Sequence, residues 1–307
     1  MTGKLKLAIF TSETHFLEWT KSFDARFFTP VSGSGVRFVI SKASMAMRMR
    51  LFLRNADAAF ADFLTPIAAK VTHVSTKPVF IRIHRFELDY PDIFTKVNWD
   101  NVAGVIAVSE HYRGLIGKLI PKDIPLVAIP PGVDENQWPF HPCESGRICT
   151  WALPSARKRI YDLSLALKGY TLHVGGLSAR DRILIDRNER WSLGHVLEPD
   201  AQFPSWLWDK EIYVHHALDE SFGVAISEAM LSGLIPLVHR VPCVTEFVPE
   251  SLTFIYDNEL RSLIETIRLM ASDERLALKE SLRQTILDKY TARTTALRIA
   301  DFISSHI

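Results

Sequence analysis

The sequence has 307 residues, enough for two domains of ordinary size, and 47% hydrophobic with 23% charged residues is typical of a globular protein. The formal net charge is +1 and no basic stretch with interleaved aromatic residues occurs, so we expect no nucleic-acid partner. The three cysteines, Cys143, Cys149 and Cys243, lack Cys-x-x-Cys spacing. They favour neither a disulfide framework nor a zinc site, and they predict a reducing, cytoplasmic compartment.

The first apolar run, Leu5–Thr11, is too short for a signal peptide and predicts a buried first strand. No stretch of about 18 uncharged apolar residues follows it, so we expect no transmembrane helix.

Apolar runs rich in β-branched residues alternate with helical patterns through the first half of the chain. The predicted strands are Leu5–Thr11, Val36–Ile40, Ala58–Phe60, Val79–Ile83, Gly104–Ser109 and Leu126–Pro130. The predicted helices include Thr65–His73 and His111–Leu119. Continuous apolar strands separated by helices predict a parallel sheet with both faces covered.

Two proline clusters, at Pro130-Pro131 and between Trp138 and Pro142, interrupt this pattern and predict a domain boundary near residue 142. The alternation then starts again. The predicted strands are Arg147–Ala152, Thr171–Gly175, Ser192–Leu197, Glu211–Leu218, Ile235–Arg240 and Leu252–Tyr256. The predicted helices are Lys158–Leu167, Val224–Ser232, Glu259–Ala271, Ser272–Tyr290 and Ala292–Ser304.

These patterns predict an α/β protein of two Rossmann-like, doubly wound domains with parallel sheets. We place the domains at residues 1–141 and 142–290, with a terminal helix in 291–307. Ligands of such folds bind at the carboxyl ends of the strands, so we expect the site in a cleft between the domains.

The segment from Glu220 to Glu228 carries the most chemical information. A strand ends near Leu218, a short polar loop follows, and a helix begins at about Val224. Gly223 allows close approach of the backbone to a ligand, and the first helical turn favours an anion such as a diphosphate. The two carboxylates can address different hydroxyl-bearing parts of one extended ligand.

The order Glu220-Ser221-Phe222-Gly223, followed by Glu228, resembles the Glu-x7-Glu signature of GT-B glycosyltransferases, above all of the retaining group called family 4. Ser221 stands where that family usually has glycine. Segments elsewhere agree with the resemblance, which is strong over about 100–290 and weak before residue 75. They are Ile83-His84-Arg85, Gly104–Glu110 with its Ser109, Gly132-Val133-Asp134, Arg157-Lys158 and Glu246.

The resemblance implies transfer of a sugar, with retention of configuration, from a UDP-sugar or GDP-sugar to a hydroxyl acceptor. The acceptor could be a glycan, a lipid-linked saccharide or another alcohol. The first domain would lie on the acceptor side and the second would bind the donor. The final helix resembles one that returns to the first domain in this fold.

Site roles follow from the same resemblance. Glu220 would hold sugar hydroxyls, Lys158 and Arg157 would stabilise the leaving diphosphate, and His84 would contact the sugar or the acceptor. Glu228 would accept hydrogen bonds from the donor ribose. The remaining expected donor contacts are Ser109, Ser221, Phe222, Gly223 and Val224. No Asp-x-Asp motif occurs in a suitable place, so we expect neither a metal nor another cofactor.

Two departures leave alternatives open. The loop Thr11–His15 lacks the usual glycine turn, and Ala152-Leu153 stand where the family has an arginine. A non-catalytic GT-B-like binding or assembly subunit, or a nucleotide-sugar epimerase of the same fold, would also fit.

Two further patterns have more than one interpretation. Met45–Arg54 could form a basic amphipathic helix that touches a membrane at its inner face, or an ordinary domain helix. His215 and His216 point to opposite faces of a strand, which favours structural roles over metal binding. The nucleobase, the sugar, the acceptor and the oligomeric state are not readable from these patterns.

Overall fold

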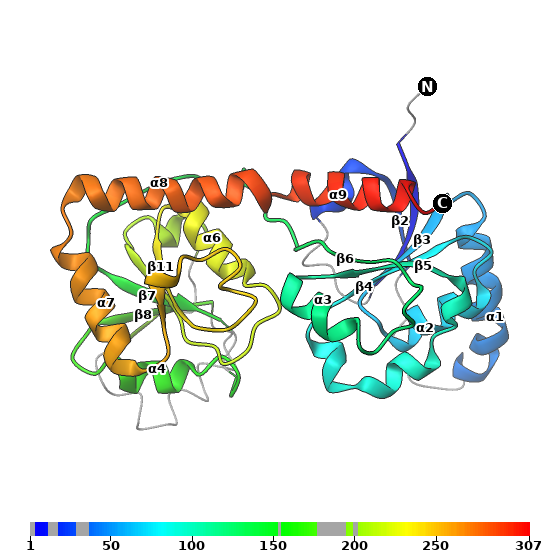
Figure 1. The fold of residues 1–307 in the computed structure, drawn as a ribbon, viewed down its shortest axis with the longest axis horizontal. Coiled ribbons are helices and arrows are strands. Elements are labelled where there is room, and N and C mark those ends of the chain that lie inside the picture. Colours follow the sequence, from blue (N-terminus) through cyan, green and yellow to red (C-terminus); the bar gives the residue numbers. More distant parts are fainter. Residues whose placement is uncertain (1–3, 12–17, 29–36, 153–154, 177–194, 199–201) are drawn as a thin grey trace. The chain divides into compact units, whose positions relative to one another are not determined.

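The computed structural model describes residues 4–11, 18–28, 37–152, 155–176, 195–198 and 202–307 (Figure 1). The chain forms two compact units. Unit 1 comprises residues 1–132 and 292–307, and unit 2 comprises residues 133–291. The division thus falls between Gly132 and Val133, ahead of the second proline cluster, whereas the sequence placed it near residue 142.

Unit 1 contains a parallel sheet in the order β2-β1-β3-β4-β5-β6. Its strands are β1 Lys6–Phe10, β2 Asp24–Phe28, β3 Ala58–Asp62, β4 Val79–Ile83, β5 Val102–Ala107 and β6 Leu126–Ala128. Its α-helices are α1 Arg37–Leu53, α2 Pro66–Val74, α3 Glu110–Ile116 and α9 Ala292–Ser304. Short 3-10 helices are η1 Glu18–Ser22, η2 Phe86–Asp89, η3 Pro91–Lys96 and η4 Trp99–Asn101.

The sequence prediction of unit 1 was wrong in one segment and incomplete in another. Val36–Ile40 was predicted as a strand, but its residues from Arg37 onward begin helix α1. The run of Val, Phe and Ile suits a strand, but the helix-forming residues that follow it extend the helix backwards. Strand β2 was not predicted, because its residues Asp24 and Arg26 break the apolar run and leave it as a mostly exposed edge strand.

Helix α9 is part of unit 1 although it comes last in the chain. Its apolar stripe of Ala296, Ile299 and Ile303 is buried in the core of that unit, together with residues such as Phe80. Gly104 on β5 makes room for this helix, because a Cβ atom there would lie 2.7 Å from the ring of Phe302. The sequence spacing of the stripe, at i, i+3 and i+7, accounts for this packing.

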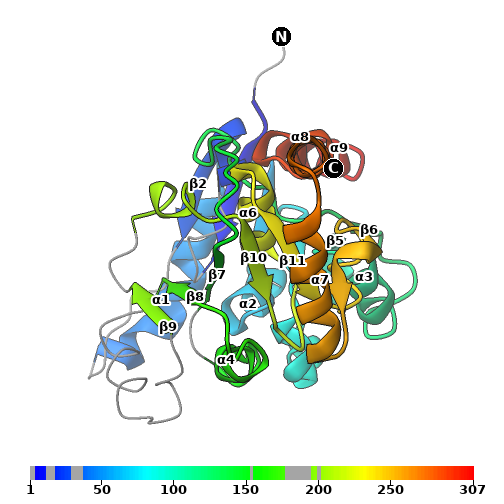
Figure 2. The same ribbon diagram turned by 90° about the vertical axis from the view of Figure 1, so that its left-hand side faces the viewer.

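Unit 2 contains a second parallel sheet, in the order β12-β11-β10-β7-β8-β9 (Figure 2). Its strands are β7 Ile148–Trp151, β8 Leu172–Gly175, β9 His195–Glu198, β10 Ile212–His215, β11 Ile235–His239 and β12 Thr253–Phe254. Its α-helices are α4 Ile160–Ala166, α6 Val224–Ser232, α7 Asp257–Leu269 and α8 Ser272–Lys289. The 3-10 helices η6 Ser205–Leu207 and η7 Glu250–Leu252 connect some of them.

A buried ion pair fixes helix α8 against the rest of unit 2. Lys279 Nζ lies 2.8 Å from Glu211 Oε1, and both side chains are almost fully buried. The other oxygen of Glu211 accepts a hydrogen bond from Gly146 N at 2.7 Å. A buried carboxylate without such partners would be strongly unfavourable, so this pairing sets where α8 meets the start of β10.

One structural observation bears on the question of membrane association. In the part of the chain that the structure describes, no helix is both long enough and apolar enough to cross a membrane. Helix α1 covers the predicted Met45–Arg54 segment up to Leu53; Met49 and Leu53 are buried, while Met47 and Leu51 are exposed.

Candidate active site

The predicted strand–loop–helix of unit 2 is present, with β10 ending at His215 and α6 beginning at Val224. Gly223 is the N-cap of α6 and has φ 107° and ψ 51°, a left-handed conformation that favours glycine. A Cβ atom at this position would lie 2.8 Å from Ile226 Cδ1. The glycine therefore allows the loop to turn tightly into the helix, whose first N–H groups have no acceptor within the helix.

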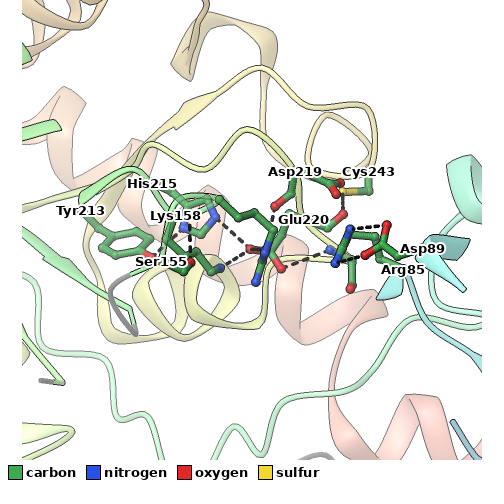
Figure 3. A network of polar contacts seen from close by, with 11 residues as sticks. Arg85, Asp89, Ser155, Lys158, Tyr213, His215, Asp219, Glu220 and Cys243 are labelled. Carbon is green, nitrogen blue, oxygen red and sulfur yellow. Dashed lines mark hydrogen bonds and ion pairs between the residues drawn. The ribbon is translucent and has the colours of Figure 1, made fainter. Parts of the chain in front are cut away.

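Glu220, in the loop before α6, lies at the centre of a polar cluster (Figure 3). Its Oε2 contacts Lys158 Nζ, lies 3.1 Å from His215 Nε2 and lies 3.5 Å from Arg157 NH1. Its Oε1 accepts a hydrogen bond from Ser221 N at 3.1 Å. Burial would raise the pKa of Glu220, but the hydrogen bond from His215 and the charge of Lys158 hold that pKa well below its usual range. The carboxylate is therefore ionised at neutral pH.

His215 and Tyr213 extend the cluster along β10. The two residues are two apart on one strand, so their side chains share a face, and Tyr213 Oη lies 2.9 Å from His215 Nδ1. Burial lowers the pKa of His215 and raises that of Tyr213, so both are neutral at pH 7. The arrangement assigns Nε2–H as the donor to Glu220 and Tyr213 Oη–H as the donor to Nδ1.

The charges of the cluster do not cancel. Lys158 and Arg157 carry two positive charges and Glu220 one negative charge, which leaves +1 while His215 is neutral. Arg157 also donates to the main-chain oxygen of Asp219 at 2.7 Å, which orients its guanidinium group beside the loop. A net positive cluster beside a helix N-terminus is suited to a phosphate-bearing ligand.

Glu228 lies one turn into α6 and has a different environment from Glu220. Burial raises its pKa from 4.5 to about 8, although a hydrogen bond with Trp151 opposes the shift. Trp151 ends β7, and its ring centroid lies 4.1 Å from that of Tyr213. At pH 7 the two glutamates predicted as a pair therefore differ in protonation: Glu220 is ionised, and Glu228 is largely protonated.

The loop residues between them contribute in unequal ways. The ring of Phe222 is buried and stacks on Phe247 with centroids 4.7 Å apart, so its side chain belongs to the core and only its main chain faces the loop. Ser221 and Val224 are half-buried. Cys243 donates from its thiol to the main-chain oxygen of Glu220 at 2.8 Å and so fixes the loop from behind.

His84, the predicted site residue of unit 1, follows β4 and belongs to a buried network. Its Nε2 lies 3.1 Å from Asp62 Oδ1, and Arg82 donates to both oxygens of Asp62 at 2.7 and 2.6 Å. Burial would raise the pKa of Asp62, but Arg82 and His84 hold it well below its usual range. Glu87 accepts from His84 N at 3.1 Å and from Leu64 N at 2.9 Å, which fixes the turn after the strand.

Ser109, also in unit 1, has an evident local role. It is fully buried, it is the N-cap of α3, and its hydroxyl accepts a hydrogen bond from Tyr112 N at 3.2 Å. Of the segment Thr11–His15, only Thr11 lies within the described residues, and Leu153 lies outside them as well.

Sequence reasoning missed His215, Tyr213, Trp151 and Cys243 as members of the Glu220 and Glu228 surroundings. His215 and His216 were assigned structural roles because adjacent strand residues face opposite ways, and they do have different partners. His216 Nε2 lies 3.3 Å from Asp257 Oδ1 and its ring stacks on Phe254. The sequence did contain a signal for two of these residues. Tyr213 and His215 are two positions apart on the predicted strand, so their side chains share the face on which His215 reaches Glu220. Among the described residues, no three His, Cys, Asp or Glu side chains gather as metal ligands would.

The comparisons with solved structures decide the fold. HepE from Anabaena, solved with UDP and glucose, is 14% identical and superposes with a TM-score of 0.77 over 98% of this chain and 100% of that one. Sucrose-phosphate synthase from Thermosynechococcus elongatus is 12% identical, with a TM-score of 0.77 over 98% and 99%. The chain has the GT-B fold.

A glycosyltransferase from Rickettsia africae is similar to this GT-B chain in the same way, with 12% identity and a TM-score of 0.75 over 99% of both chains. No protein-family model and no curated protein matches the sequence. The predicted fold class is therefore confirmed, whereas the resemblance to family 4 stays a prediction.

Proposed function

We propose that this GT-B protein transfers a sugar from a nucleoside diphosphate sugar to a hydroxyl acceptor, with retention of configuration. The observation that carries the proposal is the cluster in which ionised Glu220 meets Lys158, Arg157 and His215 beside the N-terminus of α6. One carboxylate and two cations, brought together from the segment before α4 and the loop before α6, suit a ligand that joins a sugar to a diphosphate. HepE was solved with UDP-glucose, which supports this class of donor.

The cations would act on the leaving group. As the bond between the anomeric carbon and the diphosphate oxygen breaks, negative charge grows on the diphosphate, and preorganised positive groups stabilise that charge. Lys158 is mostly buried and Arg157 is partly exposed, so the lysine would contribute the more fixed charge. The first N–H groups of α6 would add to it.

The two glutamates would hold the other parts of the donor. Glu220, ionised, would accept hydrogen bonds from sugar hydroxyls, and His215 would keep its carboxylate in position. Glu228 would meet the ribose hydroxyls. The new bond forms between the acceptor oxygen and the anomeric carbon, and the acceptor proton passes to the departing diphosphate oxygen, so the chain needs no base of its own. Retention and independence of metal ions are both part of the proposal.

The test is an assay of the full chain with UDP- and GDP-sugars, which measures nucleotide release with and without EDTA. We expect one donor to be hydrolysed slowly or transferred, with the rate unchanged by EDTA. The Lys158→Met variant should lower the rate about 100-fold, in line with the loss of one electrostatic contact in a transition state. Lys168→Met, an exposed lysine of the same unit, is the matched control.

The products separate the alternatives. A transferase releases free nucleoside diphosphate, an epimerase yields a second nucleotide sugar, and a non-catalytic subunit changes no donor. NMR of the product's anomeric proton reports the configuration, and inversion would contradict the retaining mechanism. If no nucleotide sugar binds or reacts, the proposed function is wrong.

A further inference from the structure

Helix α1, which runs along one side of unit 1 (Figure 1), has a buried and an exposed face. Met49 and Leu53 lie on the buried face, where they are 0% and 1% exposed. On the opposite face Met47 is 57% and Leu51 60% exposed. Residues four apart are neighbours on one side of a helix, so Met47 and Leu51 place two large apolar side chains next to each other in solvent.

Three exposed arginines flank this apolar pair. Because a helix has about 3.6 residues per turn, Arg50 and Arg54 lie on one side of the pair and Arg48 lies on the other. Arg50 Nε donates to Val74 O at 3.4 Å, and the guanidinium carbon of Arg48 lies 6.0 Å from the centroid of the Phe28 ring. Within the described part of the chain, none of the three guanidinium groups forms an ion pair with a carboxylate. Their charges are therefore open to a partner outside the chain.

The segment around α1 carries charge of a single sign. Between Asp24 and Asp57 the sequence contains no acidic residue, and its charged residues are Arg26, Arg37, Lys42, Arg48, Arg50 and Arg54. The exposed Leu297 on α9 offers a contrast, because the exposed Asp301 follows it one helical turn later. The exposed face of α1 thus combines apolar side chains with positive charge that no neighbouring acid offsets.

A bilayer with anionic headgroups satisfies both halves of this face. Its acyl region accepts the apolar pair, and its phosphate groups accept the arginines, whose long side chains reach outwards from a helix that lies in the interface. A second copy of the chain fits less well, because a two-fold contact through this face would set its arginines against each other. A nucleic acid also fits less well, because the apolar pair at the centre of the face cannot bond to phosphates.

We propose that the exposed face of α1, made of Met47, Arg48, Arg50, Leu51 and Arg54, docks on an anionic phospholipid bilayer. The helix lies flat at the level of the headgroups, with Met47 and Leu51 inserted between lipids and the arginines bound to phosphate groups. Two apolar side chains and three charges give weak, reversible binding, so both contributions are needed. The inference goes beyond the proposed sugar transfer and does not depend on it.

The experiment is co-sedimentation of the full chain with vesicles of phosphatidylcholine alone and of phosphatidylcholine mixed with phosphatidylglycerol. We expect binding to the mixed vesicles in about 0.1 M salt, and much weaker binding in about 1 M salt, which screens the charges. The Arg48→Gln and Arg54→Gln variants should each bind about fivefold more weakly, the scale of one cation at such a surface. The double variant Met47→Gln with Leu51→Gln should bind about tenfold more weakly.

Helix α9 of the same unit supplies the matched controls. Arg293→Gln and Leu297→Gln change an exposed arginine and a leucine that is 57% exposed, as Met47 is, and both should bind like the original chain. Circular dichroism of every variant checks that the fold is intact, which we expect because all the substituted side chains are exposed.

The docking surface is refuted if the mixed vesicles do not bind the chain in low salt, or if neutral vesicles bind it equally well. It is also refuted if the α9 variants weaken binding as much as the α1 variants do. Self-association that the Met47 and Leu51 double variant abolishes, without vesicle binding, would refute it in favour of a second copy. Binding of polyuridylate in place of vesicles would refute it in favour of a nucleic acid.

Discussion

The Glu228→Gln substitution is expected to stabilise the protein at alkaline pH and to have little effect in acid. Burial raises the pKa of this carboxyl from 4.5 to about 8 in the folded chain. The folded state therefore holds the proton more tightly than the unfolded state. By linkage, the free energy of unfolding falls as the pH rises from 4.5 towards 8, and the full loss is present above pH 8.

The magnitude follows from the same shift. At about 1.4 kcal/mol per pKa unit, a change from 4.5 to about 8 corresponds to an upper limit of about 5 kcal/mol. Because Glu228 is only half-buried, water screens part of this cost, and we expect about 2 kcal/mol. Glutamine has nearly the same size and cannot ionise. The variant should therefore exceed the original chain in stability by about 2 kcal/mol at pH 8.5 and equal it near pH 4.5.

The assay is urea unfolding of both proteins at pH 4.5, 6.5 and 8.5, followed by tryptophan fluorescence and circular dichroism. Glu280→Gln, an exposed glutamate on α8, is the control and should show no such trend. A stability difference between the Glu228 variant and the original chain that stays constant across the three pH values would refute the reasoning. It would mean that Glu228 is ionised in the folded protein at neutral pH.

Three further substitutions probe the neighbouring geometry. Tyr213→Phe removes the hydrogen bond to His215 Nδ1 and should cost about 1 kcal/mol of stability, seen in urea unfolding, with a lower rate of nucleotide release. Gly223→Ala places a Cβ atom 2.8 Å from Ile226 Cδ1 at φ 107°, so unfolding should be easier by about 1–3 kcal/mol. Asp62→Asn leaves buried Arg82 without its counter-charge and should cost about 3–5 kcal/mol in the same measurement; an effect below 1 kcal/mol would contradict the buried ion pair.

The fold was largely predictable because local signals and packing agree in most elements. Helices α6 and α9 have the bounds expected from the sequence, since glycines flank the first and an apolar stripe marks the second. Strand β2 and the start of α1 were not predicted. In both segments, side-chain composition conflicts with the structure that the surrounding chain imposes.

The candidate site was predictable in its motif but not in its contacts. The spacing of Glu220 and Glu228 marked the loop and helix, and Lys158 was expected nearby. The sequence does not reveal that Lys158 and Glu220, 62 positions apart, pair directly, or that His215 donates to the same carboxylate. These contacts depend on how β7 and β10 lie side by side in the sheet, which is a tertiary property. The opposite protonation of the two glutamates likewise depends on burial.

The central claim is that Lys158 and its cluster bind the diphosphate of a nucleotide, and calorimetric titration with UDP, UMP, GDP and GMP tests it most directly. We expect one diphosphate to bind about 10- to 100-fold more tightly than its monophosphate, the scale of one charge-assisted hydrogen bond. Lys158→Met should remove most of that difference, while Lys168→Met should keep it. Equal binding of diphosphate and monophosphate, an unchanged difference in the Lys158 variant, or no binding of any of the four nucleotides would contradict the claim.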